Sequence, residues 1–176
     1  MTSAVNDIQS RLNETVVDEI VAVESLGSTQ DAIGRAAAAG APIAIAGGRH
    51  AMGGQQFCTG GRLLDTRGMA QVLSFDREAG TIEVEAGIQW PALIDYLSSV
   101  QGDREPQWGI AQKQTGADRL SIGGAIAANV HGRGLSMQPL VSDIESLVLV
   151  DAKGEALTCS REENSEIGRA SCRERV

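Results

Sequence analysis

One of the two histidines of the chain lies in a glycine-rich segment, IAIAGGRHAMGGQQF, which covers residues 43–57. A short apolar run leads into Gly47 and Gly48, and Arg49 and His50 follow directly. Two glycines at the end of a strand allow a sharp turn whose backbone N–H groups point into one concavity, which suits a phosphate or pyrophosphate. His50 would then lie beside whatever the phosphate carries. The alternative is an ordinary strand-ending turn in which the histidine has a structural role.

The other histidine lies in a second glycine-rich segment, GADRLSIGGAIAANVHGRG, residues 116–134. Its glycines and alanines would let the backbone lie flat against a long ligand, while Ser121 and Asn129 offer small polar groups. The alternative is a tightly packed core segment of small residues. Because each segment holds one histidine, the two together favour a single extended ligand that is held at both ends.

Other kinds of active site find little support in the motifs. The chain contains no P-loop, no GxGxxG fingerprint and no nucleophile elbow. A hydrolase that uses His50, His131 and Cys58 as a nucleophile–base set is therefore a weak alternative. Cys58 and Cys159 are far apart in the chain and form no metal-spaced pair, so we expect neither a disulfide framework nor a metal site.

Two strands joined by a helix are expected to position the first segment. The strands are predicted at residues 16–23 and 42–46, and the helix between them at STQDAIGRAAAAGAP, which begins at Ser28. Ser28 is the expected N-cap, and Gly40 is the expected stop. A β-α-β order of this kind predicts parallel strands with a right-handed crossover. A further strand is expected at residues 62–66.

The remainder of the chain has an antiparallel pattern. A hairpin is expected at QVLSFDREAGTIEVEAG, and a helix that opens at Trp90 and Pro91 follows it. A second hairpin, DIESLVLVDAKGEALTC, is expected to turn at residues 151–154. The predicted fold class is therefore α+β, with lobes at about residues 1–68 and 69–166.

Five short motifs together resemble the FAD-binding domain of the vanillyl-alcohol oxidase/para-cresol methylhydroxylase (PCMH-type) family of flavoproteins. They are AGGRHAMGGQ, LLDTRGM, VEAGIQWPALIDYL, SIGGAIAANVHGRG and VLVDAKGE, in the order and spacing of the family. The resemblance runs from about Asn6 to Asn164 and is greatest with the branch of sugar-lactone and alditol oxidases. It implies a two-lobed domain, with a small parallel β-α-β lobe and an antiparallel sheet with helices, that binds FAD between the lobes.

The resemblance also implies cofactor-binding roles for residues of both segments. The first glycine turn would bind the FAD pyrophosphate through backbone N–H groups, and the second segment would wrap the flavin. Arg49 could equally meet a phosphate charge or lie exposed in the turn. The implied FAD-binding residues are Ala46, Gly47, Gly48, Arg49, His50, Ala51, Met52, Gly116, Ala117, Ser121, Gly123, Gly124, Ala125, Asn129, His131 and Gly132.

In many members of this branch, the histidine that matches His50 is bonded covalently to the 8α-methyl of the flavin. His50 is therefore the candidate for a covalent FAD link, since a neutral imidazole is a good nucleophile. A second link through a cysteine, found in some members, would fall near Ala117, so only one link is expected. Two alternatives are a dehydrogenase with dissociable FAD and a non-catalytic domain that binds another nucleotide.

The activity implied by the resemblance is that of a flavin-dependent oxidoreductase acting on a small substrate, with hydride transfer from an alcohol carbon to flavin N5. In the family, a strand that completes the FAD pocket and a substrate domain follow the region that matches SREEN. We therefore expect a C-terminally truncated domain, inactive alone, whose catalytic residues lie outside the chain. Residues 167–176, IGRASCRERV, back-translate to a common sequencing adapter, so we expect them to be non-native. A genuine basic tail is the alternative.

Composition restricts the partners of the protein. The formal charge of −8 disfavours nucleic acid and anionic membranes, and 3% aromatic residues give little scope for base stacking. No hydrophobic run approaches the length of a membrane span, and the N-terminus lacks the apolar core of a signal peptide. We expect a cytoplasmic protein whose partners are FAD and a small-molecule substrate; the sequence does not fix its oligomeric state.

Overall fold

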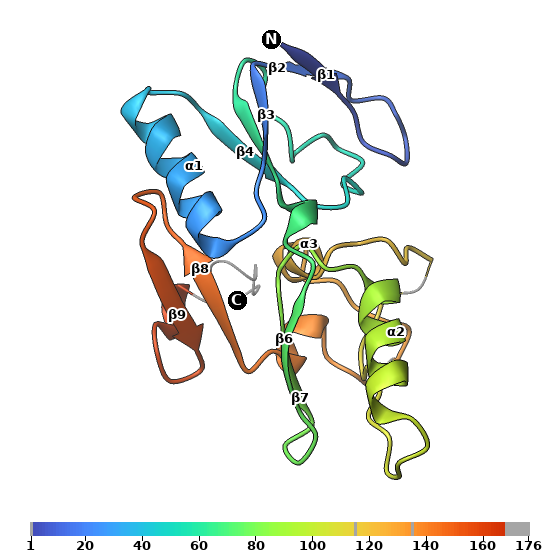
Figure 1. The fold of residues 1–176 in the computed structure, drawn as a ribbon. Helices are drawn as coiled ribbons and strands as arrows, with labels where there is room; N and C mark the ends of the chain where they lie inside the picture. The colour runs from blue at the N-terminus through green and yellow to red at the C-terminus, as the bar shows by residue number, and fades with distance from the viewer. Residues whose placement is uncertain (1, 115, 135, 168–176) are drawn as a thin grey trace.

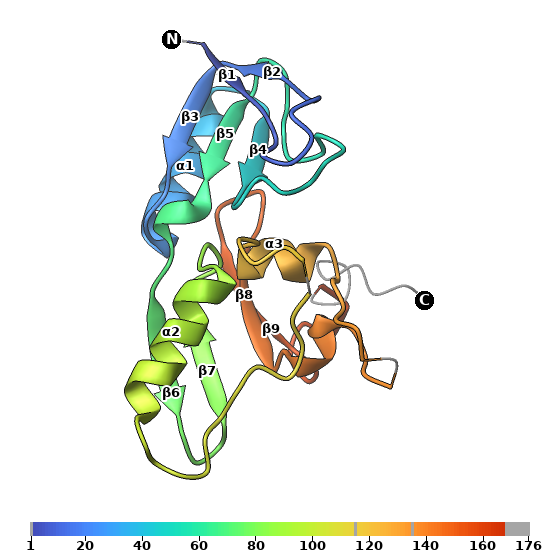
Figure 2. The same ribbon diagram turned by 90° about the vertical axis from the view of Figure 1, so that its right-hand side faces the viewer.

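The computed structural model describes residues 2–114, 116–134 and 136–167. The chain forms two lobes, which lie one above the other in Figure 1 and in the side view of Figure 2. The N-terminal lobe carries a parallel sheet and one helix, and the second lobe carries antiparallel hairpins and the other helices. The predicted two-lobed α+β class is confirmed. Of residues 167–176, only Ile167 is described, so the expectation of a non-native tail falls almost wholly outside the described residues.

The parallel sheet of the N-terminal lobe has the strand order β3-β5-β4. Its central strand pairs in parallel with both neighbours, so that Ala46 and Asp65 lie side by side at one end of the sheet. The predicted β-α-β unit is confirmed, with the third strand between the other two. The strands are β3 (Glu19–Ala22), β4 (Ile43–Ala46) and β5 (Arg62–Asp65).

The prediction of one continuous strand over residues 16–23 is wrong. The strand is interrupted at Asp18, and the part before it, β2 (Thr15–Val17), pairs antiparallel with β1 (Ser3–Val5). Tertiary pairing with β1 therefore divides an apolar run that local pattern alone does not divide.

Helix α1 (Leu26–Ala38) covers one face of the parallel sheet. Its buried residues Ala32 and Ile33 pack with Val23 and Leu64 in one apolar cluster. The N-cap is Ser25 and not the predicted Ser28, because the two serines form a reciprocal capping box in which Ser28 is the third helical residue. The predicted stop is correct, since Gly40 follows the helix with a φ of 61°.

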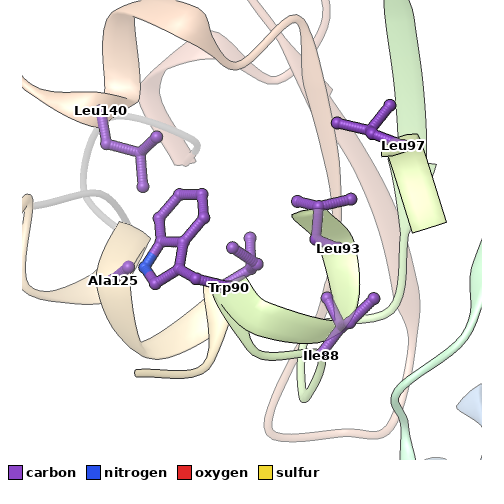
Figure 3. Close-up of a cluster of buried hydrophobic side chains, with 7 residues drawn as sticks. Ile88, Trp90, Leu93, Leu97, Ala125 and Leu140 are labelled. Atoms are coloured by element: carbon purple, nitrogen blue, oxygen red, sulfur yellow. The ribbon is translucent and has the colours of Figure 1, made fainter. Parts of the chain in front are cut away.

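The second lobe is built around a buried tryptophan. Trp90, the first residue of α2, is 2% exposed and packs with Ile88, Leu93, Ala125 and Leu140. Figure 3 shows these side chains gathered from α2 and the residues just before it, from α3, and from the segment after α3. Full burial of each large apolar side chain contributes about 1.5–3 kcal/mol, so this cluster fixes the start of α2 against α3. Both elements adjoin the candidate site.

The elements of the second lobe agree with the predicted hairpins and helix. The first hairpin, the helix at Trp90 and the second hairpin are all present, and the short helix α3 was not predicted as a helix. Among the described residues, no helix combines the length and the apolar character that a membrane crossing requires. The bounds are η1 (Thr66–Gly68), β6 (Val72–Asp76), β7 (Thr81–Val84), α2 (Trp90–Gln101), α3 (Ile122–Ala127), η2 (Leu140–Asp143), β8 (Ser146–Val150) and β9 (Ala156–Ser160).

The β8-β9 hairpin links the two lobes. Val150 packs against the apolar cluster under α1, and Gln30 of α1 donates a 2.7 Å hydrogen bond to the Gly154 carbonyl oxygen in the hairpin turn. Figure 1 shows the hairpin lying directly below α1. The relative position of the lobes is therefore held by side-chain contacts as well as by the connecting chain.

Candidate functional site

The first glycine-rich turn begins where β4 ends. Ala46 is buried, and its carbonyl oxygen accepts a 3.3 Å hydrogen bond from Thr66 Oγ1 at the end of the neighbouring strand. Arg49 has a φ of 55°, a left-handed conformation that is uncommon for a residue other than glycine. Turns that include such a residue direct successive N–H groups into one concavity.

The backbone N–H groups of this turn have no acceptor among the described residues. None of the N–H groups from Gly48 to Met52 donates a hydrogen bond to another described residue, whereas Gly54, just beyond them, donates to the Ala51 carbonyl. Backbone donors in folded proteins are nearly always paired with protein or solvent. Five consecutive N–H groups are thus free to bind an external acceptor.

The turn touches the second glycine-rich segment where that segment begins. A Cβ atom on Gly47 would overlap Ser121 Oγ and lie 2.8 Å from Ser121 Cβ, and one on Gly48 would overlap the Arg119 carbonyl oxygen. Only glycine fits at these two positions without displacing the Ser121 side chain or the Arg119 backbone. The structure therefore brings together the first turn and the start of the second segment, as the sequence predicts.

Residues 86–89 hold the second segment in this place. The amides of Ile122 and Gly123 donate to the carbonyl oxygens of Ile88 and Ala86, at 2.9 and 2.8 Å. Gln89 forms an isolated antiparallel bridge with Ser121, which is 4% exposed. Ala125, one turn into α3, is buried in the core beside Trp90, and Gly124 is exposed.

A buried carboxylate lies beneath the first turn. Asp65, 6% exposed, accepts hydrogen bonds from Arg49 Nη2 at 3.1 Å and from Arg67 Nε at 2.8 Å. Burial by itself would raise the pKa of Asp65, but the hydrogen bonds and charge of Arg67 and the charge of Arg49 outweigh it and hold the pKa below its ordinary value. Two guanidinium charges against one carboxylate leave this cluster net positive, which favours an anion.

Of the two roles that the sequence suggested for Arg49, that of an exposed turn residue is wrong, because the side chain is 16% exposed and its guanidinium is paired with Asp65. The other role, contact of its charge with a phosphate, stays a prediction.

His50 is half-buried and is held at one ring nitrogen. Its Nδ1 lies 3.1 Å from the amide nitrogen Nε2 of Gln9, while its own Nε2 is buried without a hydrogen-bond partner among the described residues. Burial lowers the pKa of His50, and the nearby Arg119 carbonyl oxygen opposes this shift in part. A neutral imidazole at physiological pH follows, which is the form that can act as a nucleophile.

The unpartnered buried polar atoms gather at the two glycine-rich segments. Among the described residues there are six such atoms, and five belong to these segments: Arg49 Nε, His50 Nε2, both amide atoms of Gln56, and Asn129 Oδ1. The sixth is Trp90 Nε1 in the core. Buried polar atoms that lack a partner are rare and costly, so their concentration here indicates a place where a ligand completes the hydrogen bonding.

The later part of the second segment is arranged differently. His131 is exposed, and its Nδ1 lies 2.9 Å from the Gly132 carbonyl oxygen. The Gly132 amide donates at 3.1 Å to Gln112 Oε1, a side chain that is buried. Gly116 has a φ of 94° and is exposed, and Ala117 is half-buried.

No hydrogen bond among the described residues joins any two of His50, His131 and Cys58, which counts against the hydrolase alternative.

Sequence reasoning missed several residues of this site. Gln9 and Asn13 contact the turn from a loop near the N-terminus, Gln56 contributes buried amide atoms, and Asp65 pairs with Arg49. Gln56 and Asp65 lie within motifs already singled out, so a search for polar residues flanking the turn would have found them. No local signal marks Gln9 and Asn13, because their partners lie 41 and 39 residues further along the chain.

Comparisons with known proteins point to one family. A model of the family described as FAD binding domain matches residues 17–160. An L-gulono-1,4-lactone dehydrogenase from Mycobacterium tuberculosis is 33% identical over 158 residues, which are 86% of this chain and 34% of that protein. An L-gulonolactone oxidase from Mus musculus is 27% identical over 148 residues, 84% of this chain and 32% of that protein. The chain thus spans about a third of the length of these relatives.

A solved structure shares the fold. The crystal structure of 6-hydroxy-D-nicotine oxidase from Arthrobacter nicotinovorans matches with a TM-score of 0.74 and 18% sequence identity. The match covers 97% of this chain and 38% of that chain. At this identity the likeness concerns the arrangement of the elements, and it extends over both lobes.

Proposed function

The chain belongs to the family of FAD-binding domains of the vanillyl-alcohol oxidase/para-cresol methylhydroxylase type, and on this premise we propose that it holds the FAD of an oxidoreductase. The whole enzyme would oxidise a small substrate at an alcohol carbon, with flavin N5 as the hydride acceptor. FAD supplies the redox chemistry, and the residues of this chain bind and orient it.

The free N–H groups of the first turn are the observation that carries the proposal. Five consecutive backbone donors, from Gly48 to Met52, lack an acceptor among the described residues, and the net positive Arg49–Asp65–Arg67 cluster lies beside them. A pyrophosphate offers several anionic oxygens and would satisfy such donors. Gly47 and Gly48 leave the start of the turn without Cβ atoms, which suits close approach of a phosphate there.

The second segment would hold the flavin end of the cofactor. Ser121, Gly123 and Gly124 begin beside the turn, and Asn129 Oδ1 is a buried acceptor without a partner among the described residues. The remaining members of the predicted set, Gly116, Ala117, Ala125, His131 and Gly132, are proposed to line the same end.

His50 is proposed to carry the covalent link. The ring is half-buried, and burial lowers its pKa and keeps it neutral, so that one of its nitrogens carries a free lone pair. A C–N bond to the flavin 8α carbon replaces one methyl C–H and one ring N–H bond. Two protons and two electrons are released, and the electrons require a final acceptor such as dioxygen.

The test compares the two histidines of the chain, which form a matched pair. The protein is incubated with FAD in air, freed of unbound flavin, and precipitated with acid. We expect flavin absorbance in the native fraction and flavin retained in the pellet for the wild type and for His131→Ala. His50→Ala is expected to release its flavin into the acid supernatant.

Each outcome selects one interpretation. If flavin binds to the native wild type but is found in the acid supernatant after precipitation, the covalent link is contradicted and the dehydrogenase with dissociable FAD is supported. A folded protein that binds no flavin, with or without another bound nucleotide, contradicts the FAD proposal itself. Retention by His50→Ala would assign the link to a different residue.

A further inference from the structure

We propose that the loop of residues 6–13 positions the first glycine turn, and that Gln9 in this loop holds the His50 ring with its proton on Nε2 and its lone pair on Nδ1. The loop lies outside both glycine-rich segments. The inference rests on the proposed function where it concerns FAD, but the geometry behind it involves only residues of this chain.

The loop is organised around one buried carboxylate. Asp7 is 1% exposed, and the loop folds back on it so that backbone and side-chain donors converge on its two oxygens. These bonds hold the pKa of Asp7 well below its ordinary value, with the Asn13 amide as the largest cause. The donors are Gln9 N at 3.0 Å, Ser10 N at 2.6 Å, Ser10 Oγ at 2.8 Å, Arg11 N at 3.3 Å and Asn13 Nδ2 at 2.9 Å.

Three hydrogen bonds join this loop to the glycine turn, one on each side of His50 and one to its ring. The Ile8 amide donates to the Arg49 carbonyl oxygen at 3.1 Å, and Asn13 Nδ2 donates to the Met52 carbonyl oxygen at 2.7 Å. Between them, Gln9 Nε2 reaches His50 Nδ1. The backbone on both sides of His50 is therefore fixed by the same loop that contacts its ring.

The Gln9 contact determines which ring nitrogen is basic. The side-chain nitrogen of glutamine is a donor only, so the facing Nδ1 must accept and must be unprotonated in the neutral ring. The ring proton then resides on Nε2, the buried atom near the Arg119 carbonyl oxygen. Nδ1 is thus the nitrogen that carries the lone pair, and Gln9 is a positioning residue that acts through His50.

The test is ¹⁵N–¹H correlation NMR of the histidine rings in the 176-residue chain without FAD, at a pH above the pKa of His50. His131→Ala identifies which signals belong to His50. In the wild type we expect the ¹⁵N shift of a protonated nitrogen at Nε2 and of an unprotonated one at Nδ1. Gln9→Leu removes the donor and should move both shifts towards the average of the two tautomers.

Gln9→Glu is the decisive variant, because it replaces the donor by an acceptor of similar size. We expect the ring proton to move to Nδ1 and the pKa of His50 to rise. Gln71→Glu adds the same charge to an exposed side chain of the other lobe and should leave the ring shifts unchanged. Gln9 is exposed, so neither Gln9 variant removes a core contact.

The outcomes separate this proposal from the proposed function. Ring ¹⁵N shifts that are the same in wild type, Gln9→Leu and Gln9→Glu would overturn the positioning role. A wild-type ring already protonated at Nδ1 would overturn the tautomer. The FAD-retention assay is independent of these measurements: a wild type that binds no FAD contradicts the proposed function and leaves the NMR result standing.

Discussion

Substituting Gly47 by alanine tests whether contact between the two glycine-rich segments fixes the site. The added Cβ would overlap Ser121 Oγ and lie 2.8 Å from Ser121 Cβ and 3.6 Å from Thr66 Oγ1. Ser121 is held by the Gln89 bridge and by burial, so it cannot turn away without moving the start of α3. Overpacking of this kind typically destabilises a protein by about 1–3 kcal/mol, and we expect a value in this range.

Removing the opposing side chain should relieve the clash. Ser121→Gly alone is expected to cost about 0.5–1 kcal/mol through backbone entropy, because the Ser121 side chain makes no capping hydrogen bond. In the double variant the Cβ added at position 47 keeps only its ordinary 3.6 Å contact with Thr66 Oγ1, so the two changes together should destabilise less than the sum of their separate effects. A favourable coupling of about 1 kcal/mol or more is expected for residues in direct contact.

Urea denaturation of the four proteins in the cycle measures these free energies of unfolding. The control is Gly34→Ala in α1, where an added Cβ meets nothing within 4 Å. Additive effects of Gly47→Ala and Ser121→Gly, or no loss of stability in Gly47→Ala, would refute the conclusion that the segments are in contact.

Three further predictions concern the frame around the site. Gly34→Ala should itself raise the free energy of unfolding by about 0.5–1 kcal/mol through helix propensity, seen as a higher melting temperature; an unchanged value would contradict its place inside α1. Ser25→Ala should lower the free energy of unfolding by about 1 kcal/mol, because the N-cap is lost. If Ser28 were the N-cap, Ser28→Ala would be the more destabilising of the two substitutions. Asp65→Asn should cost about 2 kcal/mol at pH 7, since it weakens charged hydrogen bonds to Arg49 and Arg67. The pKa of Asp65 is lower in the folded state than in the unfolded state. The contribution of its ionised carboxylate to the free energy of unfolding is therefore present above the unfolded-state pKa and is lost as the pH falls through the folded-state pKa. The difference in the free energy of unfolding between wild type and Asp65→Asn should shrink below about pH 4. A difference that stays constant into acid would contradict that ion pair.

Local patterns were sufficient for most elements of this fold. Alternating apolar residues and turn signals marked both hairpins, and the apolar run ending in paired glycines marked β4 and its turn. These elements are determined by residues close together in the sequence, so they can be predicted from local patterns. The direct contact of Gly47 with Ser121 was not predicted, because it joins residues that are far apart in the sequence.

The two errors in the elements have different causes. The break at Asp18 depends on pairing with β1, whereas the N-cap of α1 depends on which of two serines, three residues apart, lies outside the helix. A capping box is reciprocal, so the spacing alone is compatible with either serine as its start. The loop around Asp7 has no apolar periodicity. Its contact with the first glycine turn is seen only in the structure, through hydrogen bonds to the carbonyl oxygens of Arg49 and Met52.

Arginine at position 49 places a positive charge at the first glycine turn of an acidic protein. The chain carries a formal charge of −8, yet charges further away than about 8 Å are largely screened at physiological ionic strength. At the end of β5, the guanidinium groups of Arg49 and Arg67 both pair with the one carboxylate of Asp65, and Arg49 itself adopts the left-handed conformation. Glycine would adopt that conformation without the cost of about 1–2 kcal/mol that arginine incurs, but it could not reach Asp65. The ion pair with Asp65 offsets this cost and at the same time ties the turn to the end of β5, so a single side chain supplies both the charge and the anchor.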